Sequence, residues 1–277
     1  MMLDEDYAAA AAAGFDKTPA EGPYTLAMSN SAIFVPLTNI TIDYMDIINR
    51  IREMVANGSA SAYLPSDYKS NAKMVAGYKH QLTILSKMLS SPKVPSIESL
   101  FATGTGARAL LLHPLSRGTV RLNLSDHLEL PVLDARTASN PVDFDLHLVH
   151  LRYLRRMVNT TSLQAYGAVE VTPGGSLQSD NDLLEYIKRN MILTYYHPCC
   201  TAAMMPEGEG GVVTPELKVY GAEGLRVVDM SVIPFLPSSH LSSTAYAIGE
   251  KVCDHILTHS LTNHAQAAHM IIRDWTR

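Results

Sequence analysis

The sequence predicts a globular α+β protein, because helical and strand-like patterns are both present and do not alternate regularly along the chain. Hydrophobic residues make up 47% of the 277 residues and charged residues 18%, a composition that supports a packed core and argues against disorder. A chain of this length folds as one large domain or as two unequal domains.

Charge and hydropathy argue against two classes of protein. The formal net charge is −5, and the longest run of basic residues is Arg155-Arg156, so the basic patch of a nucleic-acid-binding protein is missing. No segment approaches the roughly 18 consecutive apolar residues of a membrane span. The opening residues place acids before an alanine run, so we expect a small-residue helix there and not a signal peptide.

Residues 41–57 form the first clear amphipathic pattern. Their apolar side chains share one helical stripe, namely Ile47, Ile48, Ile51, Met54 and Val55. Gly58 follows as a stop signal. A second helix is predicted over residues 67–90, and it ends before the two prolines of the SSPKVPS loop.

Residues 139–158 predict a third helix from its start signals. Asn140 is suited to cap the helix, Pro141 fits its first position, and Asp143 lies near the positive end of the helix dipole. Residues 180–190 predict a further short helix.

Strand-like alternation in residues 116–124 places Val120, Leu122 and Leu124 on one face. Two short β-rich runs follow in the last third, at residues 217–220 and 225–229, with a glycine-bounded turn between them. After His240, we expect Ser242 or Ser243 to cap a helix. Its inward residues are predicted to be Ala245, Ile248, Val252 and Ile256.

Cysteines occur only at positions 199, 200 and 253, too few and too oddly numbered for a disulfide framework. Zinc sites usually separate their thiolates by two to four residues, so His197, Cys199 and Cys200 predict a tightly packed loop and no metal site. Four glycosylation sequons favour passage through the secretory pathway, and they begin at Asn39, Asn57, Asn123 and Asn159.

The segment Gly104–Ala109 approaches a dinucleotide fingerprint, with Asp126 about 20 residues further on. No clean strand precedes it, and Pro114 interrupts any following helix, so we do not assign a nucleotide site. His147 and His150 lie three residues apart on an arginine-rich helix, where we expect exposed surface residues and no metal ligands. No G-x-S-x-G segment supports serine hydrolysis.

His197 and His240 are the remaining candidates, and each lies beside a sharp change in chain direction. On composition alone, a structural role is the more frequent one for a histidine. However, residues 196–256 as a unit, from YHPCC to KVCDHI, closely resemble the carboxy-terminal signature of the glucose-methanol-choline (GMC) oxidoreductases. Upstream, LSRGTVRL and the helix after Asn140 resemble the substrate domain of that family more loosely.

The resemblance implies an FAD-dependent enzyme that oxidises a small-molecule alcohol. His197 and His240 would flank the reactive edge of the flavin and act as the acid–base pair. A neutral imidazole suits this task, because the hydroxyl proton must leave together with the hydride. Asp229 and Met230 would lie near the cofactor. Leu241 and Ser242 would begin a helix whose free N–H groups face the reduced flavin.

The resemblance also implies an antiparallel sheet with flanking helices in a substrate-binding-like domain at residues 1–193. Residues 194–277 would belong to an FAD domain whose amino-terminal half, with the phosphate-binding fingerprint, is absent. Cys200 replaces a glycine of the family pattern, and Met230 replaces a small residue, so both put a close approach to the flavin in question. Three alternatives stay open: an alcohol-oxidising flavoprotein, a split enzyme that needs a partner chain with the missing half, and an inactive remnant that serves as a binding protein.

Overall fold

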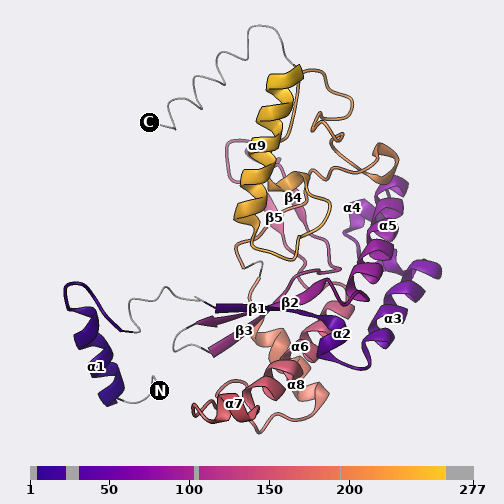
Figure 1. Ribbon diagram of the computed structural model, residues 1–277. Coiled ribbons are helices and arrows are strands. Elements are labelled where there is room, and N and C mark those ends of the chain that lie inside the picture. The colour runs from indigo at the N-terminus through magenta and orange to yellow at the C-terminus, as the bar shows by residue number, and fades with distance from the viewer. Residues whose placement is uncertain (1–4, 23–30, 103–105, 194, 260–277) are drawn as a thin grey trace. The chain divides into compact units, whose positions relative to one another are not determined.

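The computed structural model describes residues 5–22, 31–102, 106–193 and 195–259, and it confirms the α+β class with antiparallel sheets (Figure 1). The chain divides into two compact units. The first unit comprises residues 1–57, 83–116 and 138–193, and the second comprises residues 58–82, 117–137 and 194–277. The assignment of residues 1–193 to a substrate domain stays a prediction.

A three-stranded antiparallel sheet forms the centre of the first unit. Its strands are β1 (Ser31–Pro36), β2 (Pro95–Ala102) and β3 (Gly106–Leu111), in the order β1-β2-β3. The sequence pattern did not predict this sheet, because β2 buries Ser96, Glu98 and Ser99 and so has polar residues on both faces. The segment that approached a nucleotide fingerprint continues into β3, and its residues 104 and 105 lie outside the described residues.

The described part of the first unit also contains helices. They are α1 (Glu5–Phe15), α2 (Leu37–Ile40), α3 (Tyr44–Ala56), α6 (Val142–Val158), α7 (Thr161–Gln164) and α8 (Asp180–Asn190). Helix α6 packs against β3, α3 and α8 and is the central helix of the unit (Figure 1). The predicted stripe of α3 is confirmed, since Ile47, Ile48, Ile51 and Met54 are buried. Gly58 adopts a φ of 76° after the helix ends.

The start of α6 is fixed by two side chains. The carbonyl oxygen of the Asn140 side chain accepts a hydrogen bond from the backbone N–H of Val142 at 3.1 Å, as a helix cap does. The buried carboxylate of Asp143 accepts hydrogen bonds from the backbone N–H groups of Leu115 and Ser116, at 2.7 and 3.0 Å, and from the Ser116 hydroxyl at 2.6 Å. Asp143 therefore also ties α6 to the segment that follows β3.

The prediction that His147 and His150 are exposed surface residues was wrong. His150 is fully buried, with Nε2 3.1 Å from the Ser96 hydroxyl, because this face of α6 packs onto the sheet. Burial lowers the pKa of His150 well below its ordinary value, and the charge of His147 lowers it further. Burial also lowers the pKa of His147 to about 4. Arginines on other faces of α6 concealed this buried side from the sequence pattern.

The second unit contains a helix that the sequence predicted as one piece but that is broken in two. Helix α4 (Ser66–Lys69) ends before α5 (Ala72–Leu89), whose last residues belong to the first unit. The Asn71 side chain accepts hydrogen bonds from the N–H groups of Lys73 and Met74 at 3.0 and 3.3 Å. Asn71 therefore starts a new helix and does not continue the old one. The 3₁₀ helix η2 (Ser59–Tyr63) precedes α4.

The predicted strands at residues 217–220 and 225–229 were wrong as regular strands. The two segments lie antiparallel but make only isolated bridges, such as Lys218 with Arg226. Leu217, Gly221 and Gly224 all have φ values between 62° and 71°, and such left-handed residues interrupt a strand. Two further 3₁₀ helices flank this region, η3 (Glu207–Glu209) and η4 (Met230–Val232).

Helix α9 (Leu241–His259) closes the second unit and confirms the helix predicted after His240. It begins before Ser242 and Ser243, so these serines lie in its first turn and do not cap it as predicted. Ile248 and Val252 pack as predicted onto a cluster of Val213, Leu217 and Val232. Ala245, predicted to point inward, is exposed, and the side chain of Ile256 lies outside the described residues.

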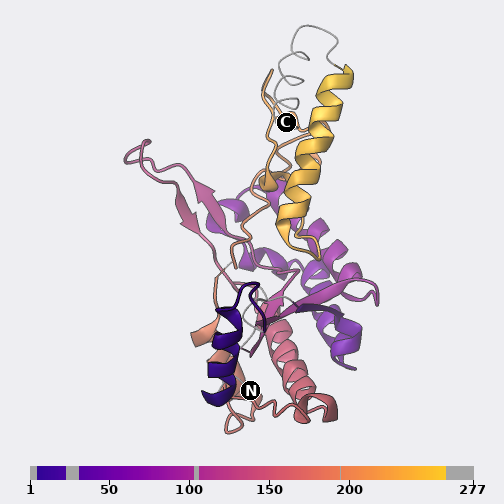
Figure 2. The same ribbon diagram turned by 60° about the vertical axis from the view of Figure 1, so that its left-hand side comes forward.

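A two-stranded hairpin also belongs to the second unit. Its strands are β4 (Thr119–Arg121) and β5 (Val132–Asp134), and Figure 2 shows the hairpin as an extended arm. The predicted strand is thus confirmed for only three residues. No helix in the described part of the chain is long and apolar enough to cross a bilayer.

Candidate active site

His197 lies in an irregular loop of the second unit. Tyr195 and Tyr196 before it have φ values of 43° and 61°, so the backbone turns sharply just ahead of the histidine. Nδ1 of His197 makes a hydrogen bond with the carbonyl oxygen of Tyr195. A carbonyl oxygen can only accept, so Nδ1 is the donor, and in the neutral ring Nε2 carries a free lone pair.

His240 lies beside His197 although the two are far apart in the sequence. Their ring centroids are 5.2 Å apart, and the ring planes are inclined by 58°. The Tyr195 ring stacks on the His197 ring. Their centroids are 6.4 Å apart, and the angle between the ring planes is 18°. His240 is exposed and immediately precedes α9. A single small molecule can therefore touch both imidazoles.

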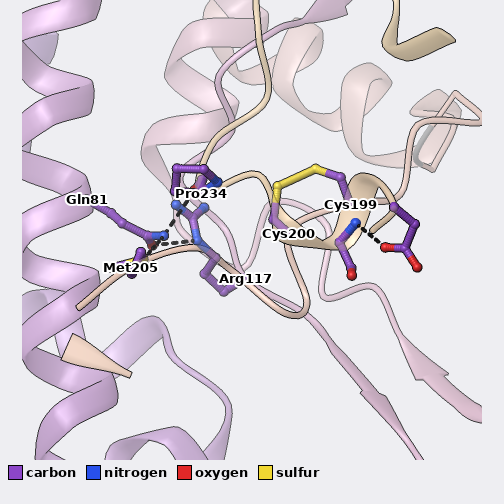
Figure 3. Close-up of a disulfide and its surroundings, with 8 residues drawn as sticks. Gln81, Arg117, Cys199, Cys200, Met205 and Pro234 are labelled. Carbon is purple, nitrogen blue, oxygen red and sulfur yellow. Dashed lines mark hydrogen bonds between the residues drawn. A yellow bond between two sulfur atoms is a disulfide. The ribbon is translucent and has the colours of Figure 1, made fainter. Parts of the chain in front are cut away.

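Cys199 and Cys200 form a disulfide between adjacent residues, which the sequence reasoning did not predict (Figure 3). Their adjacency was the available signal, but the count of three cysteines argued against any disulfide framework. Cys200 has a φ of 74°, in the left-handed region that favours glycine. Among the described residues, no group of three or more histidine, cysteine or acidic side chains is placed to hold a metal ion.

Backbone hydrogen bonds join this loop to η4. The N–H of Cys200 donates to the carbonyl oxygen of Met230 at 3.2 Å, and the N–H of Ala202 donates to that of Ser231 at 2.9 Å. The Asp229 carboxylate accepts a hydrogen bond from the N–H of Ser231 at 2.8 Å and caps η4. Asp229 and Met230 are therefore held next to the disulfide loop.

Two residues from earlier segments of the second unit support the same region (Figure 3). The Gln81 amide donates to the carbonyl oxygen of Pro234 at 3.1 Å and to the sulfur of Met205 at 3.3 Å. Nε of Arg117 donates to the Gln81 amide oxygen at 3.1 Å. The sequence gives no local signal for Gln81, because its role depends on contacts with distant segments.

The four residues predicted to contact a cofactor lie in two places. Asp229 is exposed and Met230 is half-buried, both beside the Cys199–Cys200 loop. Leu241 and Ser242 follow His240 at the start of α9. The Leu241 side chain is buried in the protein, so only its backbone can meet a ligand, whereas Ser242 is exposed. The first N–H groups of α9 have no partner within the helix, as at the start of any α-helix.

The comparisons with known proteins agree on one family. A family profile described as GMC oxidoreductase matches residues 114–249. The dehydrogenase xptC of Emericella nidulans is 38% identical over 191 residues, which cover 69% of this chain and 30% of xptC. The GMC oxidoreductase family protein Mala s 12 of Malassezia sympodialis is 35% identical over 184 residues, which cover 65% of this chain and 30% of that protein.

Solved structures show the same relationship. A fungal aryl-alcohol oxidase is 50% identical, with a TM-score of 0.78, over 99% of this chain and 43% of the oxidase. An FAD-dependent oxidoreductase from Chaetomium thermophilum is 33% identical, with a TM-score of 0.83, over 94% of this chain and 44% of that protein. The fold and these matches place the chain in a family of flavoprotein oxidoreductases. The chain belongs to the GMC oxidoreductase family and matches the carboxy-terminal part of its members.

The chain spans less than half the length of these relatives. FAD is the cofactor of the family. The residues of this region fit the ring end of a flavin, because two imidazoles lie next to one another beside a long helix whose first N–H groups are unpaired within it. Cys200, where the resemblance implies a glycine, has the left-handed conformation that glycine favours.

Proposed function

We propose that this chain takes part in the FAD-dependent oxidation of an alcohol to a carbonyl compound. The observation that carries the proposal is the 5.2 Å separation of the His197 and His240 rings, which lets both imidazoles reach one hydroxyl group. When FAD is bound, it supplies the hydride acceptor. The protein residues bind and orient the alcohol and move its proton.

His197 is the base in this proposal. Its Nδ1–H is held by the Tyr195 carbonyl oxygen, so Nε2 is the atom that takes the hydroxyl proton. His240 holds the same hydroxyl oxygen from the other side and orients the carbon–hydrogen bond that breaks. Removing the proton as the hydride departs avoids a free alkoxide, which would be costly at neutral pH.

We propose an aromatic alcohol as the substrate. The relative that is 50% identical over nearly the whole chain is named an aryl-alcohol oxidase. The Tyr195 ring beside His197 supports this choice, since it offers a flat apolar surface against which an aromatic substrate can stack.

The cofactor would be held by Asp229, the backbone of Met230 and Leu241, and the hydroxyl of Ser242. The N–H groups in the first turn of α9 would favour the negative charge that a reduced flavin carries. The phosphate end of FAD would be bound by the part of the GMC fold to which this chain does not align. A partner polypeptide that carries that part is therefore included in the proposal.

A second candidate is an inactive GMC-like protein that binds a partner or ligand without flavin. It is favoured by the larger side chains of Cys200 and Met230 at positions where the family pattern has small residues. Both side chains reduce the room for a close approach of the flavin to the backbone.

The absorbance spectrum between about 350 and 500 nm separates the two candidates. We expect a bound-flavin spectrum after FAD and a polypeptide with the remaining part of the fold are added, and bleaching when benzyl alcohol is added without oxygen. The variants His197→Ala and His240→Ala should keep the spectrum and lose the bleaching. His80→Gln, which changes an exposed histidine of the same unit, is the control and should bleach normally. If the chain takes up no flavin after FAD and this polypeptide are added, the result would support the inactive protein.

A further inference from the structure

The β4–β5 hairpin exposes an unusual number of large apolar side chains. Seven side chains in its 16 residues are at least 50% exposed, and they are Val120, Leu122, Leu124, Leu128, Leu130, Val132 and Leu133. Leu128 is 97% exposed and Leu124 is 82% exposed. Proteins rarely expose a large apolar surface to water unless that surface binds something. We refer to these seven side chains as the hairpin surface.

The hairpin is an ordered element. Val120 pairs with Leu133 across the two strands, and Arg121 pairs with Val132. A Cβ atom on Gly118 would lie 2.3 Å from the carbonyl oxygen of Asp134, so the base of the hairpin closes tightly around a glycine. At its tip, the Asn123 and Asp126 side chains accept hydrogen bonds from the N–H groups of Ser125 and Leu128, at 3.0 and 2.9 Å.

One face of the hairpin is already occupied. The guanidinium group of Arg121 forms an ion pair with Asp67 at 2.7 Å, within the second unit. Because side chains alternate along a strand, Val120 and Leu122 point away from the face that carries Arg121. Leu133, directly opposite Val120, shares their face. This second face is exposed at Val120, Leu122 and Leu133, and Val132, which pairs with Arg121 on the first face, is also exposed.

We propose that the hairpin surface is the docking site for a polypeptide that carries the part of the GMC fold to which this chain does not align. The inference deepens the proposed function by naming where that partner binds. Nearly the whole chain aligns to 43% of the aryl-alcohol oxidase, so more than half of that protein consists of additional polypeptide. A two-stranded hairpin is at best marginally stable alone, and such a partner would supply the missing cover.

The chemistry of the hairpin favours a polypeptide over a membrane. In this two-stranded sheet each strand has one unpaired edge, which a further peptide strand can extend but a lipid cannot. Elements that bind membrane surfaces are rich in lysine and arginine. The hairpin instead carries three acidic residues, Asp126, Glu129 and Asp134, against the single Arg121.

The same acidic charges disfavour a second copy of this chain as the partner that binds the hairpin surface. A symmetric dimer through the hairpin would place identical surfaces against one another, and both would be net acidic. Like charges brought together in this way weaken the contact. A different polypeptide can present complementary groups.

Co-expression tests the proposal. The full chain is produced together with a tagged polypeptide that contains the residues of the aryl-alcohol oxidase outside the matched region, and the amount of chain that co-purifies is measured. We expect an equimolar complex in which residues 119–134 become protected from hydrogen exchange. Leu128→Asp and Leu133→Asp should each reduce recovery about tenfold or more, because each puts a charge into an apolar contact. Ile42→Asp, at a 91% exposed residue of the first unit, should have no effect.

Several results would overturn the proposal. They are no complex with the unaltered chain, a complex that the hairpin variants form equally well, self-association of the chain alone that Leu128→Asp abolishes, or binding to phosphatidylcholine vesicles that Leu128→Asp abolishes. Circular dichroism of each variant checks that it is folded, which is expected because the altered side chains are exposed. A complex that forms but takes up no flavin would leave the docking site intact and would count against the proposed function alone.

Discussion

The ring centroids of His197 and His240 lie 5.2 Å apart, with Nδ1 of His197 hydrogen-bonded to the Tyr195 carbonyl oxygen. If both rings act on one hydroxyl group, their contributions to the rate are not independent. We expect His197→Gln and His240→Gln each to slow flavin reduction by an alcohol about 10²- to 10⁴-fold, and the double variant to be little slower than the worse single one.

Rapid-mixing absorbance of the flavin-loaded complex measures these rates. His80→Gln provides the control for the removal of an exposed imidazole. Effects that multiply in the double variant would show that the two rings act separately.

Cys200 provides a test of backbone conformation that is independent of catalysis. Both Cys200→Gly and Cys200→Ala remove the disulfide with Cys199, but only glycine adopts a φ of 74° without strain. We expect the glycine variant to be more stable than the alanine variant by about 1 kcal/mol in the free energy of unfolding, measured with urea.

Cys199 supplies the matched control, because it also loses the disulfide when replaced and is not among the residues with positive φ. Cys199→Gly should therefore have no advantage over Cys199→Ala. An equal preference for glycine at both positions would mean that the left-handed conformation of Cys200 is not the cause.

Asp143 and Asp145 allow a comparison of two carboxylates on one helix. Asp143 is buried and accepts hydrogen bonds from the N–H groups of Leu115 and Ser116, so Asp143→Ala leaves two backbone donors without their partner. We expect a loss of about 2–4 kcal/mol in the free energy of unfolding. Asp145 pairs with Arg50 near the surface, and Asp145→Ala should cost about 1 kcal/mol or less. Denaturant titrations of the two variants check this, and equal losses would refute the assignment.

Local patterns predicted the helices well, for physical reasons that act within a few residues. The stripe containing Ile47 and Ile51 reports the buried face of α3, and Asn140 satisfies an N–H at the start of α6 through a contact two residues away. The clustering of His197 and His240 was inferred from a family resemblance, because nothing in the residues between them fixes that distance.

Several missed features depend on distant partners, whereas the missed disulfide joins adjacent residues. Ser96 and Glu98 look like residues of an exposed segment, but they lie on the central strand of a sheet. Gln81 stabilises the loop near the disulfide through Arg117 and Pro234, which belong to separate segments. A histidine that arginines follow, such as His150, becomes a core residue only once the sheet has formed against α6.

The buried His150 and its neighbour His147 predict how stability depends on pH. Burial lowers both pKa values below the ordinary 6.5, that of His147 to about 4, so the folded protein keeps both rings neutral where the unfolded chain binds protons. Stability should therefore be constant above about pH 6.5 and fall as the pH drops towards 4, by up to about 1.4 kcal/mol per pH unit for each proton that the unfolded chain takes up.

Urea denaturation at a series of pH values measures this slope. His150→Gln can still form a hydrogen bond with Ser96 but cannot be protonated, so its stability should fall less steeply between pH 6.5 and 4. His127→Gln changes an exposed histidine and should leave the slope as it is. An unchanged slope in His150→Gln would show that the acid sensitivity of the first unit arises elsewhere.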